Sequence, residues 1–345
     1  MNDNETAYEQ KDLVLESKIK DLISYVGSDP NSFDSNLIEQ LIGSSLKMSK
    51  DGTDSGQIKL MTRAFKEMRY AYNIFSQYPD RQRVSIFGSA RTPEDHPDYI
   101  AAKAFSAAMS TMGWVCITGA ADGIMKAGLE GAEKDSSFGL SIRLPFENSS
   151  NSVLAGDPKL ITFRYFFTRK LMFLSHSHAV AAFPGGVGTQ DELFEVLTLM
   201  QTGKANLIPL VLVEGQGGTY WSEWEKYVRA ELLSNGWISA EDLSLFYLAP
   251  TVEAAVSHIR QFYSRYQSSR YVRDTLVIRL NAPLTLDQIR ILNQEFQPLI
   301  KSGEISITKP LPEETDHLDL FRIAFEHNHR KFGLLRSMID RINSF

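Results

Sequence analysis

The sequence predicts an α/β protein built on a doubly wound, Rossmann-like parallel sheet. Short apolar strands alternate with amphipathic helices between residues 83 and 266, which is typical of a parallel sheet covered by helices on both faces. A segment with helical but no strand signals precedes this region, and a shorter α/β pattern follows it. We therefore predict three domains: a helical extension over residues 1–80, a core over 81–267 and a small α/β appendage over 268–345.

The helical extension is predicted from the spacing of its apolar residues. Leu15 to Val26 keeps helical spacing, and Met61 to Phe75 does so more strongly. The polar segment Lys50–Gly56 between them predicts an exposed loop. We interpret the extension as an arm for packing or oligomerisation, and the alternative is a separate ligand-binding module.

The core elements are predicted from two patterns. Short continuous apolar runs indicate buried parallel strands, and apolar residues three to four positions apart indicate helices. In chain order we expect the strand Val84–Phe87, a helix with Ala101 to Met112 inward, the strand Trp114–Thr118, a helix from about Ile124, a strand near Phe138–Leu144 followed by a polar loop, a helix around Arg164–Ser175, the strand His178–Ala182, a helix with Leu193 to Met200 on its apolar stripe, the strand Leu207–Val213, and helices over Tyr220–Leu233 and Thr251–Tyr266.

The appendage begins where the pattern restarts, around Ser268 and Ser269. Its expected elements are the strand Thr275–Leu280, the helix Leu286–Ile300, the strand Glu304–Thr308 and a final helix over Phe321–Ile342 with Phe325, Phe332, Leu335 and Ile339 buried. On that helix His327 and His329 would face different ways. With Arg330 and Lys331 they are interpreted as a solvated face, and a phosphate or nucleic-acid contact is the alternative.

Composition and charge limit the class of protein. The 345 residues are 43% hydrophobic and 23% charged, which supports a sizeable packed core. A net charge of −6 argues against a protein that coats nucleic acid. The single cysteine, Cys116, lies in an apolar strand, excludes an internal disulfide and fits a reducing compartment. The N-terminus is polar and acidic, and no apolar run approaches the roughly 20 residues of a membrane helix, so we expect a cytoplasmic protein.

One stretch near the middle of the chain, Phe183–Glu192, joins a buried strand to a helix through a glycine-rich turn. Its sequence is F-P-G-G-V-G-T-Q-D-E. The glycines let a ligand approach the backbone closely, and the first N–H groups of the helix form a site for a phosphate. Thr189 can add a hydroxyl. Glu192 lies in the first helical turn, where a carboxylate is favoured for the helix dipole alone.

Two common phosphate loops do not fit this stretch. The pattern G-x-x-x-x-G-K-[ST] does not occur in the chain, and G-x-G-x-x-G would need a glycine where Asp191 stands. The pattern that remains, P-G-G-V-G-T-x-x-E, resembles the signature of the LOG ("Lonely Guy") family, long labelled "possible lysine decarboxylase". Members of that family are nucleoside 5′-monophosphate phosphoribohydrolases, which release a free base and ribose 5-phosphate.

The resemblance extends over roughly residues 83 to 235. Thr168-Arg169-Lys170 looks like the arginine–lysine pair that precedes the family signature, and Gly88-Ser89-Ala90-Arg91 looks like the family's first strand-turn. Thr118 to Met125 is similar to the second glycine-rich turn, commonly G-G-G-x-x-G-[IL]-M. Here Ala120 and Ala121 replace two glycines and Asp122 adds an acid, a departure that bears on base or ribose preference. The two flanking segments resemble those of longer bacterial members, which are general nucleotide nucleosidases, more than the cytokinin-activating plant type.

The resemblance implies a catalytic pair and a set of binding residues. Glu192 would stabilise an oxocarbenium-like sugar and take a proton from the attacking water, and Arg169 would orient the substrate and the glutamate. The residues expected to bind the phosphate or the rest of the nucleotide are Gly185, Gly186, Val187, Gly188, Thr189, Lys170, Ser89, Arg91, Gly119, Asp122, Gly123 and Met125. The reaction needs no cofactor and no metal. The resemblance also implies a homo-oligomer, at least a dimer, that acts on an AMP-like nucleoside 5′-monophosphate. From the charge and the apolar pattern we expect no membrane partner and no nucleic-acid partner.

Several of these residues have a plainer interpretation. Asp191 points about 100° away from Glu192 on a helix, so a solvent-facing acid is favoured. Arg169 and Lys170 in isolation would form an ordinary charged face. Arg91 and Asp122 are left open between a ligand contact and a surface or turn role. His176 and His178 suggest a metal pair only in extended chain, and no third ligand is near in sequence.

Two other functions compete with the hydrolase. A nucleotide sensor or carrier could use the same loop for binding without turnover, which the altered second turn and the two flanking segments favour. A lysine decarboxylase would need pyridoxal phosphate on a lysine, and no lysine context in the sequence indicates one. The base preferred by the hydrolase is not predicted.

Overall fold

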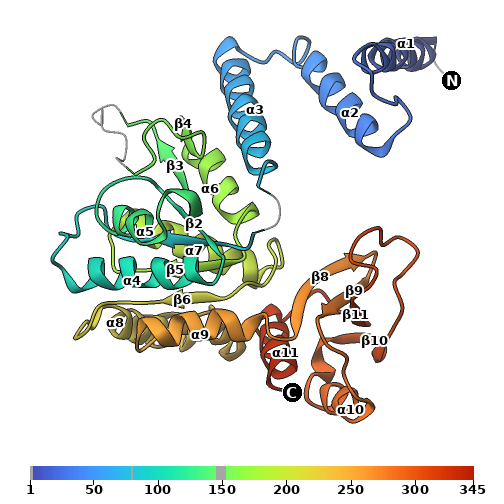
Figure 1. Ribbon diagram of the computed structural model, residues 1–345. Coiled ribbons are helices and arrows are strands. Elements are labelled where there is room, and N and C mark those ends of the chain that lie inside the picture. Colours follow the sequence, from blue (N-terminus) through green and yellow to red (C-terminus); the bar gives the residue numbers. More distant parts are fainter. Residues whose placement is uncertain (1–2, 79–80, 145–152) are drawn as a thin grey trace. The chain divides into compact units, whose positions relative to one another are not determined.

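A computed structural model describes residues 3–78, 81–144 and 153–345 (Figure 1). It divides the chain into two compact units, Met1–Glu67 and Met68–Phe345. The polar loop predicted after Leu144 falls at residues 145–152, outside the described residues. Within the described part of the chain, no helix combines the length and the apolar character needed to cross a membrane.

The first unit is helical, which confirms the expected extension. It contains α1 (Asp3–Tyr25), α2 (Phe33–Lys47) and most of α3 (Ser55–Phe75). The hydroxyl of Ser32 caps α2 by accepting a hydrogen bond from the backbone N–H of Ser35 at 3.1 Å. Between α2 and α3 the chain forms the predicted exposed loop, and the Asp54 carboxylate accepts hydrogen bonds from the first N–H groups of α3.

The second unit contains a parallel sheet of seven strands among the described residues. Its strands are β1 (Arg83–Phe87), β2 (Val115–Thr118), β3 (Ser137–Ile142), β4 (Leu160–Phe163), β5 (Ala179–Ala182), β6 (Leu210–Leu212) and β7 (Tyr247–Leu248). Their order is β4-β3-β2-β1-β5-β6-β7, and each neighbouring pair is parallel. The chain moves outward from β1 to β4 and returns to the other side of β1 at β5. The predicted doubly wound sheet is therefore confirmed.

Helices cover both faces of this sheet. They are α4 (Pro97–Thr111), α5 (Ile124–Ala132), α6 (Phe166–Ser175), α7 (Val187–Gln201), α8 (Tyr220–Tyr227), which continues as a π-helical segment over Val228–Leu233, and α9 (Val252–Phe262), with 3₁₀ turns at Lys134–Ser136 and Ala240–Leu245. Alternate residues of each strand enter opposite cores, so Val84 and Ile86 pack with α4, α5 and α9, while Phe87 packs with α6 and α7. Cys116 is fully buried in the first of these cores, as predicted.

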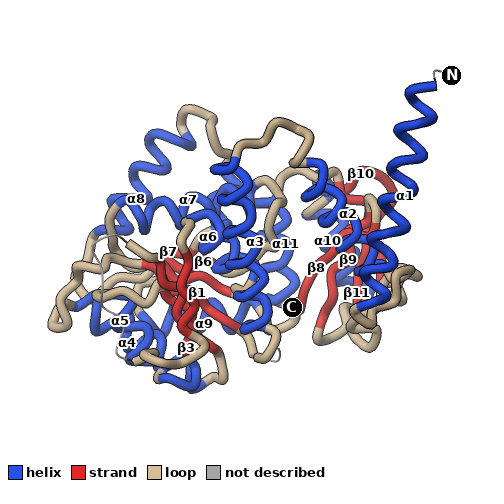
Figure 2. The backbone as a smooth tube through the Cα atoms, turned by 90° about the horizontal axis from the view of Figure 1, so that it is seen from above, coloured by secondary structure: helices blue, strands red, loops and turns tan. Residues whose placement is uncertain are grey.

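The appendage contains a second, antiparallel sheet, which Figure 2 shows as a separate group of strands. Its strands are β8 (Tyr266–Val272), β9 (Thr275–Leu280), β10 (Ile300–Ile307) and β11 (Phe321–His327), in the order β10-β11-β9-β8. Two helices, α10 (Leu286–Glu295) and α11 (Phe332–Ser344), and a 3₁₀ turn at Gln297–Leu299 complete it. The small α/β appendage is confirmed, and the predicted domain boundaries at residues 80 and 267 stay predictions.

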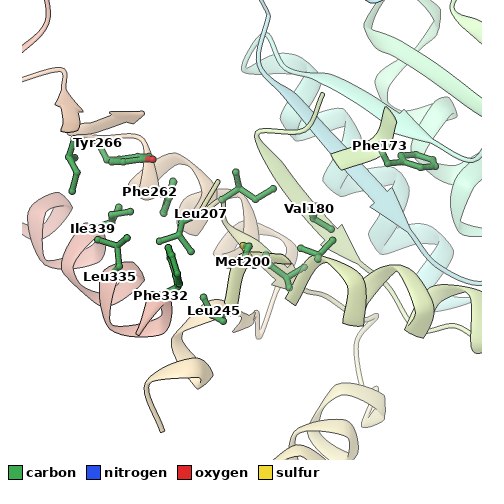
Figure 3. Close-up of a cluster of buried hydrophobic side chains, with 14 of the residues drawn as sticks. Phe173, Val180, Met200, Leu207, Leu245, Phe262, Tyr266, Phe332, Leu335 and Ile339 are labelled. Atoms are coloured by element: carbon green, nitrogen blue, oxygen red, sulfur yellow. The ribbon is translucent and has the colours of Figure 1, made fainter. Parts of the chain in front are cut away.

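One apolar cluster joins the two sheets of the second unit. Figure 3 shows Phe332, Leu335 and Ile339 of α11 in the same cluster as Val180 of β5 and Met200 of α7. The Phe332 ring lies directly over Gly203, where a Cβ atom would come within 2.0 Å of it. The C-terminal helix is therefore packed into the core of the large sheet.

Several element bounds predicted for the C-terminal part of the chain are wrong. Phe321–Ile342 is not one helix, because Phe321–His327 forms β11 and the helix begins only at Phe332. Four successive residues of β11, from Arg322 to Phe325, are buried because both faces of the sheet are covered. Ser268 and Ser269 lie inside β8, an edge strand, and the preceding helix ends at Phe262 rather than Tyr266. Likewise α10 ends at Glu295, and β10 begins at Ile300.

The two C-terminal histidines are not on a helix face. His327 is fully buried in β11, and its Nδ1 lies 2.6 Å from the Tyr271 hydroxyl. His329 follows the strand and stacks on the ring of Tyr271 at 4.7 Å. Burial lowers the pKa of His327 to about 4, so it stays neutral at physiological pH.

Candidate functional site

A cavity of about 920 Å³ opens at the carboxyl ends of β1, β2 and β5. It is lined by the turns that follow these three strands, by the end of β3 and by side chains of α5, α6 and α7. Strands β1 and β5 are the pair at which the direction of strand order reverses, and a crevice at this position is the usual ligand site of doubly wound folds. Its volume lies within the range of about 300–1,000 Å³ that small-molecule sites occupy.

Most of the predicted site residues line this cavity. They are Ser89, Arg91, Gly119, Asp122, Met125, Arg169, Gly186, Val187, Gly188, Thr189 and Glu192. Three others, Gly185, Gly123 and Lys170, are outside the lining set within the described residues. The structure thus brings together segments that are up to about a hundred residues apart in the chain.

The glycine-rich turn places the N-terminus of α7 at the cavity. The carbonyl of Gly186 accepts hydrogen bonds from the N–H groups of Thr189 and Gln190 at 3.0 and 3.1 Å. The first two N–H groups of α7, those of Val187 and Gly188, precede any possible partner within the helix and are exposed on the cavity side. They are donors available to an anion.

Gly185 acts through packing rather than by facing the cavity. A Cβ atom there would lie 2.1 Å from Thr189 Oγ1 and 2.9 Å from the backbone nitrogen of Ser89. That nitrogen donates a hydrogen bond to the carbonyl of Pro184 at 3.1 Å. Only glycine therefore lets the turn after β5 pack against the turn after β1.

The turns after β1 and β2 interlock in a similar way. Gly123 has a φ of +61°, and a Cβ atom there would come within 2.3 Å of the carbonyl oxygen of Ser89, which accepts a hydrogen bond from Ile124 N–H at 3.0 Å. Gly123 is thus a structural residue at the start of α5. The side chains of Arg91 and Asp122 lie at the exposed edge of the cavity.

Glu192 is the buried acid of the site. Its side chain belongs to α7, only 4% of the residue is exposed, and it lines the cavity. Among the described residues its Oε2 atom has no hydrogen-bond partner. Burial raises the pKa of Glu192 to about 7, although the charges of Lys170 and Arg169 act in the opposite direction. A carboxyl group with this pKa changes its protonation state near neutral pH.

Arg169 lies on α6 beside two aromatic rings. Its guanidinium carbon is 5.3 Å from the ring centroid of Phe166 and 5.6 Å from that of Phe173. Burial lowers the pKa of Arg169, and its Nε atom has no partner in the described part of the chain. Arg169 also faces Gly119, where a Cβ atom would stand 3.8 Å from its Nη1. The guanidinium therefore extends across the cavity toward the turn after β2.

Lys170 is paired with two acids of α7 and does not line the cavity. Its Nζ forms ion pairs of 2.8 Å with both Asp191 and Glu195. Burial acts to lower the pKa of Lys170, but these hydrogen bonds outweigh it and raise the pKa. Asp191 is exposed, which agrees with its predicted orientation. The influence of Lys170 on the site is its charge, which acts on Glu192.

Sequence reasoning missed an apolar part of the cavity and one lysine. The apolar residues are Phe87, Ile142, Leu144, Phe166 and Phe173. Phe166 was detectable from its place one helical turn before Arg169, whereas the others look like core residues in sequence. Lys126 lines the cavity and pairs with Glu94 at 2.5 Å.

The His176 and His178 pair is structural. His176 stacks on the Phe75 ring at 3.8 Å, and His178 Nδ1 accepts a hydrogen bond from the Arg83 N–H at 3.1 Å. Burial lowers the pKa of each to about 4. Among the described residues, no three His, Cys, Asp or Glu side chains are grouped so that they could hold a metal ion.

Comparison with known proteins identifies one domain. Residues 118–259 match the family model described as "possible lysine decarboxylase", so the chain carries a domain of the LOG family over these residues. No curated protein matches the chain.

Solved structures give matches of low sequence identity. The molybdenum cofactor binding protein from Rippkaea orientalis is 20% identical, with 53% of this chain and 97% of that chain covered and a TM-score of 0.38. The molybdenum cofactor carrier protein from Chlamydomonas reinhardtii is 19% identical, with 52% and 97% covered and a TM-score of 0.36. DNA processing protein A from Helicobacter pylori is 13% identical, with 51% and 79% covered and a TM-score of 0.36.

Proposed function

We propose that this chain, whose residues 118–259 form a LOG-family domain, hydrolyses the N-glycosidic bond of nucleoside 5′-monophosphates. The products are a free base and ribose 5-phosphate. The observation that carries the proposal is Glu192, a buried carboxyl group with one oxygen unpartnered among the described residues, in a cavity that also contains a helix N-terminus.

The N-terminus of α7 holds the 5′-phosphate. The N–H groups of Val187 and Gly188 donate to its oxygens, and the positive end of the helix dipole favours its charge. Glu192 lies five residues further along α7, about 7–8 Å at 1.5 Å per residue. Side chains on a helix lean toward its N-terminus, so the carboxyl group reaches back toward the bound phosphate. The ribose then lies between the phosphate and Glu192.

Glu192 performs the chemistry in its carboxylate form. A water molecule attacks C1′ of the ribose, and the C1′–N bond breaks with its electron pair leaving on the base. The carboxylate takes a proton from the water and stabilises the positive charge that develops on the sugar. Arg169, held by Phe166 and Phe173, orients the substrate by charge-assisted hydrogen bonds. The departing base takes a proton from solvent.

A nucleotide sensor or carrier is the second candidate. The observation that favours it is the turn after β2, where Ala120 adopts a φ of +54° that glycine would adopt without strain. This turn and the glycine-rich turn line the same cavity, so a change in it can retain nucleotide binding and alter nucleotide turnover.

Decarboxylation of lysine is the weaker alternative. It requires a neutral lysine amine that forms a Schiff base with pyridoxal phosphate. Within the described residues, the lysine that lines the cavity is Lys126. Its hydrogen bond to Glu94 raises its pKa, which keeps the amine protonated and opposes that chemistry.

Release of free base from a panel of nucleoside 5′-monophosphates tests the proposal. The matching nucleosides serve as controls, and EDTA is present throughout. We expect release from the phosphorylated substrates alone, because the phosphate supplies the positioning. Binding of nucleotide without any release would identify the sensor or carrier instead.

A further inference from the structure

Three hydrogen bonds in series, which we call the relay, connect α8 to the glycine-rich turn at Gly185. The indole N–H of Trp224 donates to Oε1 of Gln190 at 3.0 Å, and Nε2 of Gln190 donates to the hydroxyl of Tyr220 at 2.7 Å. The Tyr220 hydroxyl donates to the carbonyl oxygen of Gly185 at 2.6 Å. Trp224, Gln190 and Tyr220 are outside the cavity lining within the described residues, so they act on the loop and not on a ligand.

The direction of the relay is fixed by chemistry. An indole N–H can only donate, so the atom of Gln190 that meets Trp224 is the amide oxygen. The amide nitrogen therefore faces Tyr220, and because it too can only donate, the phenol oxygen must accept. The phenol proton is then committed to Gly185. Trp224 thus determines the direction in which the Tyr220 hydroxyl points.

The hydrogen bond to Gly185 orients the next donor along the backbone. The carbonyl of Gly185 and the N–H of Gly186 belong to one trans peptide plane, so they point in opposite directions. Holding the carbonyl toward Tyr220 turns the Gly186 N–H away from it, on the side where Gly186 lines the cavity. Among the described residues this N–H donates no hydrogen bond.

We infer that Tyr220 and Gln190 are positioning residues that set the Gly185–Gly186 peptide so that its N–H faces the phosphate of the substrate, which rests on the proposed function. Glycines on both sides of this peptide leave it free to rotate in the absence of the phenol. A rotated peptide would direct the Gly185 carbonyl at the phosphate and replace an attractive contact with a repulsive one. Phosphate affinity therefore depends on a tyrosine that the ligand does not touch.

Binding of ribose 5-phosphate to the full chain, measured by titration calorimetry, tests the inference without turnover. Tyr220→Phe removes one hydroxyl and keeps the ring, so we expect the Kd to rise about tenfold, the value of one lost hydrogen bond to a charged group. The matched control is Tyr227→Phe on the same helix, an exposed phenol, which should bind as the wild type does. Equal affinity of Tyr220→Phe and wild type would overturn the inference.

Kinetics with AMP add a readout that a purely structural role would not give. The phosphate contact is the same in the ground state and the transition state, so Tyr220→Phe should raise KM about tenfold and leave kcat within about twofold. Gln190→Leu keeps the phenol but no longer orients it, and its KM should fall between those of Tyr220→Phe and wild type. A loss confined to kcat, or a Gln190→Leu variant identical to wild type, would contradict the relay.

The two proposals fail in different ways. A wild-type protein that binds ribose 5-phosphate but releases no base overturns the hydrolase, and the calorimetric comparison of Tyr220→Phe still decides the relay. A wild-type protein that hydrolyses AMP, with Tyr220→Phe unchanged in both Kd and KM, overturns the relay alone. Melting temperatures of all variants confirm that each is folded.

Discussion

Glu192 combines burial with a charge that its proposed role requires. Burial penalises the carboxylate and raises its pKa to about 7, while Lys170 and Arg169 limit the rise. The result is a group that is ionised in a large share of molecules at neutral pH and still basic enough to take a proton from water. A fully exposed glutamate would be ionised but a much weaker base.

The rate of base release should therefore increase with pH. Below its pKa, Glu192 is protonated and cannot accept a proton, so kcat/KM should fall as pH decreases through about 7. The profile is measured between pH 5 and 9 with AMP as substrate. A profile that is flat through pH 7, or that falls as pH rises through it, would contradict the role of Glu192 as base.

Lys170→Met provides the control for this assignment, because the substrate phosphate also titrates, with a pKa of about 6. Removing Lys170 deletes a positive charge that lowers the pKa of Glu192 and leaves Asp191 and Glu195 uncompensated, which raises it further. The limb of the pH profile should move to higher pH. If the limb does not move, the group that titrates is the substrate phosphate and not Glu192.

The direction of side chains was the least predictable feature of the site. The sequence placed Lys170 among the nucleotide contacts because it follows Arg169, but the structure turns it to Asp191 and Glu195. Neighbouring residues on a helix point about 100° apart, and sequence does not tell which of two faces the cavity. The relay through Gln190 and Tyr220 was also invisible, since it joins residues thirty positions apart.

The glycine-rich turn shows how one element depends on close packing. At Gly185 a Cβ atom would meet Thr189 Oγ1 at 2.1 Å, whereas at Gly188 no atom lies within 4 Å of a Cβ position in the described structure. Both residues belong to the same motif, and only one of them is required by the fold.

These two glycines should respond differently to alanine. Gly185→Ala should destabilise the protein by about 1–3 kcal/mol through overpacking. Gly188→Ala should be neutral or stabilising by up to about 1 kcal/mol, since alanine is the better helix former. Urea unfolding of the two variants measures the difference. Equal stabilities would show that the packing at Gly185 is not as tight as described.

Among the strands of the large sheet, the four that are buried throughout were all predictable. Every residue of β1, β2, β5 and β6 is buried, and each strand was expected from its apolar run. The structure adds β4, β7 and β8, which lie at sheet edges. The first two are only four and two residues long, and β8 is largely polar. The β11 segment was predicted as the start of the final helix, although Phe321, Ile323 and Phe325 alternate as in a strand. In the structure its Arg322 is buried, in contact with Glu314 at 3.5 Å.

Across the whole molecule, the C-terminal helix ties the appendage to the large sheet. Arg336 on α11 is 1% exposed and reaches into the core. Its guanidinium contacts His258 Nε2 at 3.1 Å and Asp340 Oδ1 at 3.2 Å, and it lies 4.6 Å above the Phe262 ring centroid. Residues 68–345 therefore form one compact unit, and the appendage should unfold together with the core. The homo-oligomer that the resemblance implies stays a prediction.

Truncating Arg336 should destabilise the second unit. Arg336→Ala removes packing and leaves buried partners unsatisfied, at a cost of about 2–4 kcal/mol. Arg341→Ala on the same helix breaks a partly exposed pair with Glu295, at a cost of up to about 1 kcal/mol. Thermal unfolding should show a lower Tm for Arg336→Ala in a single transition. Equal effects of the two substitutions would argue against the anchoring role of Arg336.

The most direct test of Glu192 as the catalytic base is the turnover of Glu192→Gln compared with its ligand binding. The substitution preserves the shape of the side chain and removes its ability to take a proton. We expect kcat for AMP to fall by about 10²–10⁴-fold, with the Kd for ribose 5-phosphate within about threefold of wild type. Full turnover by Glu192→Gln would contradict the proposed catalytic role of Glu192 and the assignment of this cavity as a hydrolase site.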